Sequence, residues 1–192
     1  MKISWKDAVS QFKIQKIYEN ASFENCTEIP KKIVEIGKKW ISTKKKPSLY
    51  ISGPCGSGKT FFMTALLRSL IEIEGYGRMI YKRCYSLDSE LLNAFNEGNE
   101  EYILKKYSEV EFLFLDDFGV ERQSERVNRQ FYVILDERVG NRLPTVITTN
   151  FSIEITREKF NEKIESRIKS FFEICFPNED LRESTTFDFL DE

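Results

Sequence analysis

One eight-residue segment has the residue types and the spacing that suit the binding of phosphate groups. Residues 53–60 fit the P-loop pattern G-x-x-x-x-G-K-[ST] at every position. Glycines let the backbone curl so that successive N–H groups point at phosphate oxygens. Lys59 adds a positive charge for the β- and γ-phosphates, and the Thr60 hydroxyl can bind Mg²⁺. The segment predicts a nucleotide site formed by Gly53, Pro54, Cys55, Gly56, Ser57, Gly58, Lys59 and Thr60.

Two carboxylates follow an apolar run farther along the chain. Residues 112–115 are Phe-Leu-Phe-Leu, and Asp116 and Asp117 come directly after them. Ligands of parallel sheets bind beyond the carboxyl ends of the strands, so we expect the pair to face the phosphates. Asp116 suits Mg²⁺, which takes few carboxylates and keeps several waters, and Asp117 could orient or deprotonate the attacking water. An acidic turn before Phe118 is the alternative, and the neighbouring phosphate loop favours the site.

Predicted strands and helices alternate along the chain, as they do in an α/β fold, and this fold would hold the candidate site residues in place. Short apolar runs predict strands at residues 49–52, 79–81, 112–115, 145–148 and 171–176. Helical spacing predicts helices at residues 31–43, 59–74, 87–107 (one or two), 124–140 and 153–170. Continuous apolar strands are typical of a parallel sheet that is covered on both faces. The sequence therefore predicts a three-layer P-loop NTPase fold with a mostly parallel five-stranded sheet and no sizeable separate lid domain.

The length of 192 residues suits one domain, but its charge is unevenly distributed. Residues 1–60 hold 12 Lys and Arg against 5 Asp and Glu, and residues 61–192 hold 17 against 26. This asymmetry allows an anionic partner on the N-terminal side. We expect a lead-in with a helix at residues 1–45, the ATPase core at residues 46–182 and an acidic tail at residues 183–192.

The composition excludes several kinds of chemistry. Histidine is absent, which excludes His-based acid–base catalysis, triads and zinc sites that contain His. The four cysteines are far apart and form no CxxC pair, which argues against a disulfide framework. The first residues lack the apolar core of a signal peptide, and no apolar run approaches the ~20 residues that span a bilayer. We therefore expect a reduced, cytoplasmic protein without a membrane partner.

Three segments together resemble the AAA+ ATPases of the DnaC/IstB type, which are bacterial and phage helicase loaders and transposition helper ATPases. They are the phosphate loop, Phe-Leu-Asp-Asp-Phe-Gly at residues 114–119 and Leu-Pro-Thr-Val-Ile-Thr-Thr-Asn at residues 143–150. Residues 18–25 are similar to the lead-in of these proteins, and the resemblance spans residues 17–182. It implies a Mg²⁺-dependent ATPase that acts on DNA, in first place a helicase loader in DNA replication. A transposition helper and a slow, nucleotide-gated DNA-binding scaffold are the alternatives.

The resemblance also implies partners and further site residues. The partners are single-stranded DNA, a replicative helicase or a transposase, and, with ATP bound, further copies of the chain. Asn150 resembles the sensor-1 residue that positions water, although Asn is also a common turn residue. Arg167 resembles the arginine finger that reaches a neighbouring subunit's ATP, and Arg182 resembles the sensor-2 arginine. On one continuous helix, Arg167 and its rival Arg157 both lie beside the apolar stripe that includes Phe160.

Two departures from the family and one basic segment complete the sequence-based picture. Only about 45 residues precede the first predicted strand, where typical loaders have a separate helicase-gripping domain. Asp117 stands where many AAA+ proteins have Glu, and its shorter arm suits slow hydrolysis. Five lysines within residues 38–46 form either a phosphate-backbone patch or a solvated helix end, without interleaved aromatics that could stack bases. The family binds single-stranded DNA inside its oligomer, where residues 86–109 are a candidate lining.

Overall fold

The computed structural model describes residues 4–119 and 124–181, and in this part of the chain five strands form one parallel sheet. The strand order is β2-β3-β4-β1-β5, and every neighbouring pair is parallel. The prediction of a mostly parallel five-stranded sheet is confirmed. The strands are β1 (Leu49–Ser52), β2 (Met79–Arg83), β3 (Phe112–Phe118), β4 (Thr145–Thr149) and β5 (Phe172–Cys175).

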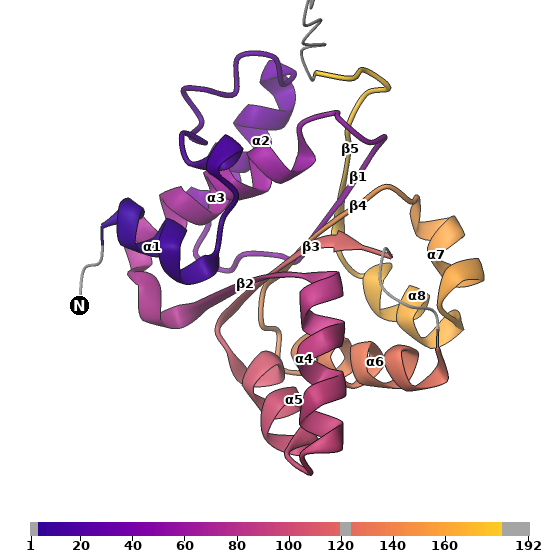
Figure 1. The fold of residues 1–192 in the computed structure, drawn as a ribbon. Coiled ribbons are helices and arrows are strands. Elements are labelled where there is room, and N and C mark those ends of the chain that lie inside the picture. The colour runs from indigo at the N-terminus through magenta and orange to yellow at the C-terminus, as the bar shows by residue number, and fades with distance from the viewer. Residues whose placement is uncertain (1–3, 120–123, 182–192) are drawn as a thin grey trace, which may run out of the picture.

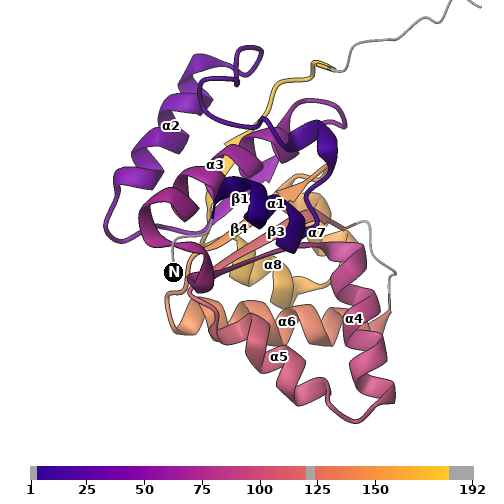
Figure 2. The same cartoon turned by 60° about the vertical axis from the view of Figure 1, so that its left-hand side comes forward.

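Helices cover both faces of this sheet, as Figures 1 and 2 show. One face carries α1 (Trp5–Phe12), α2 (Lys31–Ser42) and α3 (Lys59–Glu74). The other face carries α4 (Cys84–Asn96), α5 (Glu100–Glu109), α6 (Glu125–Gly140), α7 (Ile153–Lys159) and α8 (Glu162–Ile168). Two short 3-10 helices, η1 (Lys16–Tyr18) and η2 (Tyr76–Arg78), complete the regular structure. Among the helices of the described residues, we find none with the length and apolar character that a membrane span requires.

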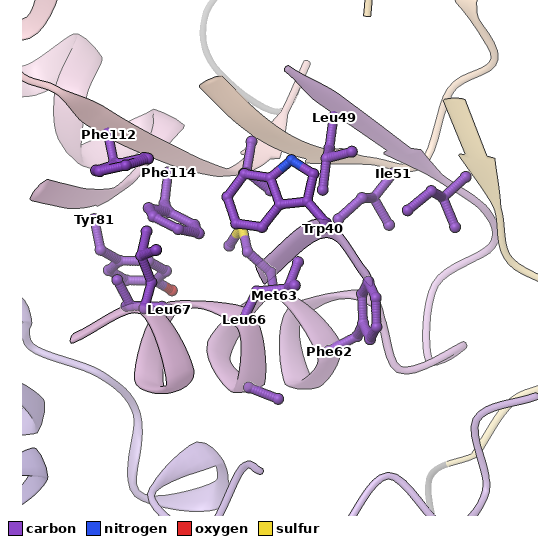
Figure 3. Close-up of a cluster of buried hydrophobic side chains, with 14 of the residues drawn as sticks. Trp40, Leu49, Ile51, Phe62, Met63, Leu66, Leu67, Tyr81, Phe112 and Phe114 are labelled. Atoms are coloured by element: carbon purple, nitrogen blue, oxygen red, sulfur yellow. The ribbon is translucent and has the colours of Figure 1, made fainter. Parts of the chain in front are cut away.

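Strand side chains alternate between two buried clusters because successive residues of a strand point to opposite faces. Leu49 and Ile51 of β1 join the cluster on the α3 side, and Tyr50 between them joins the cluster on the α6 side. Figure 3 shows the first cluster, where α3 directs a row of apolar side chains at the strands. This row consists of Phe62, Met63, Leu66 and Leu67. Burial on both faces explains why the strands read as continuous apolar runs.

The lead-in contributes to the same core. Ser4 and Asp7 form a capping box that starts α1, a helix that the sequence analysis did not predict. Ala8 of α1 and Trp40 of α2 are buried in the cluster that contains α3. The division of the chain at residue 45 stays a prediction, and the expected tail at residues 183–192 lies outside the described residues.

The prediction of a single helix over residues 153–170 is wrong. It is two helices, because α7 ends at Lys159 and the Asn161 side chain caps α8 by accepting a hydrogen bond from the Ile164 N–H at 3.0 Å. Asn is a preferred N-cap residue, so the break had a signal that the apolar spacing concealed. Phe160 and Arg167 therefore do not share a helix, and the angular comparison between them does not hold. The region between β2 and β3 likewise forms two helices, α4 and α5.

A fully buried arginine connects three elements on the α6 side of the sheet. Arg138 donates from Nη1 to the Val110 carbonyl at 2.6 Å, from Nη2 to the Pro144 carbonyl at 2.7 Å and from Nε to Thr145 Oγ1 at 2.8 Å. A further bond from Nη1 reaches the Tyr107 carbonyl at 3.0 Å. Burial lowers the pKa of Arg138 to about 9. Its planar fork satisfies carbonyls at the end of α5 and at the start of β4, which otherwise would be buried without donors.

We predict that Arg138→Met unfolds the protein more easily, with a loss of about 3 kcal/mol or more, because several buried carbonyls lose their donors. Arg129→Met on the same helix removes a side chain that is 64% exposed and should change stability by less than about 0.5 kcal/mol. Urea denaturation followed by far-UV circular dichroism measures both variants. Equal losses in the two variants would contradict the structural role of Arg138.

Candidate nucleotide-binding site

The phosphate loop connects β1 with α3, and glycines hold its curved backbone. Gly56 and Gly58 have φ values of 82° and 91°, which favour glycine over any residue with a Cβ atom. At Gly53, a Cβ atom would lie 2.7 Å from the Phe176 Cβ, so the loop lies against the end of β5. No side chain caps the start of α3, where Gly58 is the N-cap. The first N–H groups of this helix therefore point toward any anion held in the loop.

The Lys59 ammonium lies within the curve of its own loop. Its Nζ donates to the Pro54 carbonyl at 2.6 Å, and the Ser57 hydroxyl donates to the same carbonyl at 2.9 Å. Lys59 is 5% exposed, and burial lowers its pKa, while Cys55 and Asp117 oppose this shift. A phosphate oxygen offers this ammonium a charged acceptor, which forms a stronger hydrogen bond than a neutral carbonyl.

The Asp116 carboxylate joins three strands and the phosphate loop. Its Oδ1 accepts from the Thr60 hydroxyl at 3.0 Å and from the Thr148 hydroxyl at 2.6 Å, and its Oδ2 accepts from the Tyr81 hydroxyl at 2.8 Å. Burial raises the pKa of Asp116, the charge of Asp117 raises it further, and the three hydroxyls oppose the rise. The structure thus brings Thr60 and Asp116 together. Sequence reasoning missed Tyr81 and Thr148, although Thr148 lies in the quoted Thr-Thr-Asn segment.

Asp117 takes a different direction from Asp116 because β3 contains a bulge at this point. The register between β3 and β4 shifts between Leu115 and Phe118, and Asp117 has a φ of 57°. Its N–H donates to the Thr148 hydroxyl at 3.0 Å. Left-handed backbone at a bulge is uncommon for a residue with a side chain and is frequent at functional sites. The bulge separates the two carboxylates, so that Asp117 lines the adjoining cavity while Asp116 is buried.

A cavity of about 390 Å³ opens at this edge of the sheet. Its lining includes phosphate-loop residues, Asp117 and Asn150, so the structure brings these predicted residues to one place. The opposite wall comes from the lead-in, with Ile17, Tyr18, Asn25, Cys26, Glu28 and Ile29. Burial and the Asp116 charge raise the pKa of Tyr18. The volume of the cavity is that of sites for small ligands. The contribution of the lead-in to the cavity wall was not predicted from the sequence.

Of the three candidate arginines, Arg167 is the one whose side chain is described, and it does not line this cavity. Arg167 Nε donates to Asp136 Oδ1 at 2.5 Å and its guanidinium lies 5.8 Å from the centre of the Tyr132 ring. The bond to Asp136 raises the pKa of Arg167. Arg157 belongs to α7, and its side chain is not among the described parts. Arg182 lies outside the described residues, although the preceding Leu181 lines the cavity.

The donor set near the loop fits Mg²⁺. Thr60 Oγ1 and Asp116 Oδ1 lie 3.0 Å apart, and both are oxygen ligands of the kind that Mg²⁺ prefers. No group of three or more His, Cys, Asp or Glu side chains that could hold a metal occurs among residues 4–119 and 124–181. Mg²⁺ binds one or two carboxylates together with substrate phosphates and water, so the two oxygens of Thr60 and Asp116 are of the kind that would hold it.

The fold and the site define a class. A phosphate loop after an interior strand of a parallel sheet, with a buried acidic strand end bonded to its Thr60, is the arrangement of a P-loop ATPase of the AAA+ type. The crystal structure of the DnaC helicase loader superposes on the chain with a TM-score of 0.75 and 23% identity. This superposition covers 85% of the chain and 100% of that structure, and it shows a shared fold.

The particular family follows from the sequence comparison. The family model of the IstB-like ATP binding proteins matches residues 2–166, and the chain belongs to this family. The replicative helicase loader DnaI of Bacillus subtilis (strain 168) is 29% identical over 141 residues, which are 73% of the chain and 42% of DnaI. The ATP-binding protein of insertion sequence IS1162 from Pseudomonas fluorescens is 31% identical over 110 residues, 57% of the chain and 46% of that protein. The chain thus matches less than half the length of both relatives.

We predict that Asp116→Asn raises the free energy of unfolding by about 1 kcal/mol at neutral pH in the absence of nucleotide. The folded protein raises the pKa of this carboxyl, so its ionisation costs stability as the pH rises above the unfolded pKa of about 3.9. The gain should therefore shrink as the pH falls toward about 4. Chemical denaturation at several pH values measures it, and a loss of stability at neutral pH would contradict the prediction.

Glu90→Gln is the matched control for Asp116→Asn, and its expected change in the free energy of unfolding has the opposite sign. Burial would raise the pKa of Glu90, but hydrogen bonds from Lys82, Tyr107 and Lys106 lower it to about 2. The carboxylate therefore stabilises the fold above its unfolded pKa of about 4.3, and this contribution is lost as the pH falls toward about 2. Glu90→Gln should lose about 1–2 kcal/mol at neutral pH, and its difference from the wild type should shrink in acid.

Proposed function

We propose that this chain is an ATP-hydrolysing AAA+ module that acts on DNA as a loader of a replicative helicase. The observation that carries this proposal is the phosphate loop bonded through Thr60 to Asp116, beside a cavity that Asp117 and Asn150 also line. The match to the helicase loader DnaI over 73% of the chain supports the loader role. The IstB family model and the IS1162 relative support a transposition helper, which is the second candidate.

The proposed reaction is attack of water on the γ-phosphate of ATP, which breaks the bond to the β-phosphate oxygen and yields ADP and phosphate. The loop N–H groups and Lys59 hold the β- and γ-phosphates. Asp117, at the bulge, orients the water and accepts its proton, and Asn150 positions the same water from the end of β4. A Mg²⁺ ion bound by Thr60 and Asp116 would neutralise the charge of the phosphates. Tyr81 and Thr148 fix the Asp116 carboxylate at the angle that its bond to Thr60 requires.

Single-stranded DNA is the proposed nucleic-acid partner, and the region between β2 and β3 offers a surface for it. Tyr85 and Phe95 of α4 and Tyr102 of α5 are large apolar side chains that are 45%, 52% and 70% exposed. The Arg83 guanidinium lies 4.8 Å from the centre of the Tyr85 ring. Exposed aromatic rings stack on unpaired bases, and arginine adds cation–π attraction and charge. These features support the assignment of residues 86–109 to a DNA-facing surface.

Completion of the site by a neighbouring copy of the chain is also proposed. Arg167 does not line the cavity of its own chain, and its side chain is 33% exposed. Its partner Asp136 is 39% exposed, so the pair is accessible and the arginine can exchange this surface ion pair for a phosphate of the next subunit. Burial of the phosphate between two subunits would strengthen that contact relative to the surface pair.

Loader and helper are distinguished by the partner that changes ATP turnover. Steady-state ATP hydrolysis is measured at low salt with and without single-stranded DNA, and then with a hexameric replicative helicase or with a transposase of the insertion-sequence type. A change caused by the helicase alone supports the loader, and a change caused by the transposase alone supports the helper. Tight ATP binding with negligible turnover under every condition supports the slow, nucleotide-gated DNA-binding scaffold and contradicts both the loader and the helper.

Lys59→Ala and Asp117→Asn should separate nucleotide binding from hydrolysis. We expect Lys59→Ala to weaken ATP binding by tenfold or more, roughly, because the phosphates lose their buried ammonium partner. Asp117→Asn should keep ATP affinity within about twofold and lower turnover by about 100-fold, because an amide cannot accept the proton of water. Fluorescent-nucleotide titration and phosphate release measure the two effects. Full turnover by Asp117→Asn would remove Asp117 from the role of base.

Arg167→Ala should lose turnover by about tenfold or more while it keeps ATP binding, because the arginine acts on the site of another subunit. Mixing Arg167→Ala with Lys59→Ala should restore part of the activity, since some mixed interfaces combine an intact Lys59 with an intact Arg167. Phosphate release at constant total protein measures the restoration. Asp136→Asn is the structural control, because it removes the same ion pair and leaves the arginine in place. Absence of restoration, or an equal loss in Asp136→Asn, would contradict the role in trans.

A further inference from the structure

The outer face of α2 carries a dense group of lysines, which we call the lysine face. It consists of Lys31, Lys32, Lys38 and Lys39 on the helix and Lys44 and Lys45 in the following loop, all of them exposed. At about 100° per residue, Gly37 and Trp40 fall within about 40° of the buried Ile33, and the four helix lysines fall about 100–160° away from it. Figure 2 shows α2 as an outer helix that lies over α3, so this face points away from the sheet.

The lysine face concentrates positive charge on one helix and the loop that follows it. In the part of the chain that the structure describes, none of these six lysines forms a salt bridge, and Glu35 is the one carboxylate that α2 places among them. Several basic side chains elsewhere are paired with carboxylates, such as Lys82 with Glu90, Arg78 with Glu74 and Lys169 with Glu165. Hydrogen bonds and, to a smaller extent, the charge of Lys38 lower the pKa of Glu24, so Glu24 and Glu35 stand against six lysines and the face keeps a net positive charge.

Helix stability does not explain these lysines. Lys31 and Lys32 are the first two residues of α2, where the positive end of the helix dipole disfavours cations. The N-cap is Pro30, which has no capping side chain, and the first turn contains no acidic residue. Lys38 and Lys39 near the C-terminal end could be favoured by the dipole, but the same face continues at the unfavourable end. An external anion accounts for both ends of the face.

The loop after α2 is fastened to the helix, so that its lysines keep their place on this face. The Trp40 indole N–H donates to the Pro47 carbonyl at 2.7 Å, and the Thr43 hydroxyl donates to the Lys39 carbonyl at 2.8 Å. Lys46 donates to the Thr43 carbonyl at 2.8 Å and lies 5.8 Å from the centre of the Trp40 ring. Lys44 and Lys45 therefore stand on an ordered loop, which lowers the entropy lost when they bind a ligand.

We propose that the lysine face binds the phosphate backbone of duplex DNA. The helix of 12 residues is about 18 Å long, and that length of duplex carries roughly ten phosphates, which is ample for six lysines. A membrane surface is disfavoured because the apolar side of α2 is buried against the core and cannot insert. Among the described residues, no large exposed hydrophobic side chain lies within residues 31–47, which disfavours a protein groove and the base stacking of single strands.

The choice of DNA over RNA as the ligand rests on the proposed function. The inference that the lysine face binds phosphates does not depend on that function. The lysine face is also separate from the nucleotide cavity, since none of its six lysines lines that cavity. Its removal should therefore leave ATP hydrolysis in the absence of DNA unchanged. If ATP hydrolysis is absent in every variant, the proposed function fails, and the binding experiment below still tests the face.

The test uses the full chain without nucleotide and the fluorescence anisotropy of a labelled duplex of about 20 bp over salt from about 50 to 200 mM. Lys31→Gln/Lys32→Gln/Lys38→Gln should weaken binding by roughly ten- to a hundredfold and reduce the log–log salt slope by about 2.7, or 0.9 for each lost phosphate contact. The control Arg142→Gln/Lys163→Gln/Lys169→Gln removes the same number of exposed basic side chains from the loop after α6 and from the α8 region, outside residues 86–109, and should change neither value. Equal weakening in both triple variants would overturn the proposal.

Charge reversal at the start of α2 gives a test with two opposite effects. Lys31→Glu/Lys32→Glu should raise Tm by about 1–3 °C, because acids suit the positive end of the helix, and should abolish duplex binding. A higher Tm with unchanged DNA binding would overturn the proposal, because the lysines would then have no ligand. An RNA duplex or a single strand that binds as tightly as duplex DNA, with the same dependence on the three lysines, would also overturn it.

Discussion

The buried Asp116 carboxylate is the interaction on which the rest of the site depends. It receives hydroxyl groups from the first turn of α3, from β2 and from β4, so that one charged group fixes four elements relative to one another. Thr148 has a double role, because its hydroxyl donates to Asp116 and accepts the Asp117 N–H at the bulge. The distance between the phosphate loop and the acidic strand end is therefore set by β4, which lies between β1 and β3 in the sheet.

The topology explains why this carboxylate can be buried at all. β3 is an interior strand with side chains in both clusters, and its apolar residues bury it on both faces. A carboxylate near the end of β3 is removed from water, so it needs hydrogen-bond donors from neighbouring elements. The bulge then allows the next residue, Asp117, to point into the cavity instead of alternating into a core, so that adjacent carboxylates occupy one buried and one accessible position.

The sequence predicted those parts of the molecule that depend on local pattern. The phosphate loop, the apolar strands and the place of Asp116 beside Thr60 follow from short segments, and the structure brings these two residues together. The missed parts depend on residues distant in sequence. Tyr81 reads as an ordinary strand residue, and its hydroxyl has meaning only because β2 pairs with β3. The break at Phe160 was missed for a different reason, since apolar spacing continued across an Asn cap. The cavity wall from η1 and the following loop had no local signal.

Charged side chains of this chain differ in whether the fold itself stabilises their charge, and this difference separates structural from functional positions. Arg138 is fully buried, yet its guanidinium is saturated by carbonyls and a hydroxyl, so it is explained by the fold alone. Asp116 is buried with a raised pKa beside a second carboxylate, an arrangement that costs stability and that a cation would relieve. Lys31 and Lys32 stand at the wrong end of a helix, which an anion would relieve. Natural proteins retain such costs where function requires them. Both proposed ligands, a cation with a nucleotide at the sheet edge and a polyanion on the outer helix, would relieve charges that the fold alone leaves at a cost.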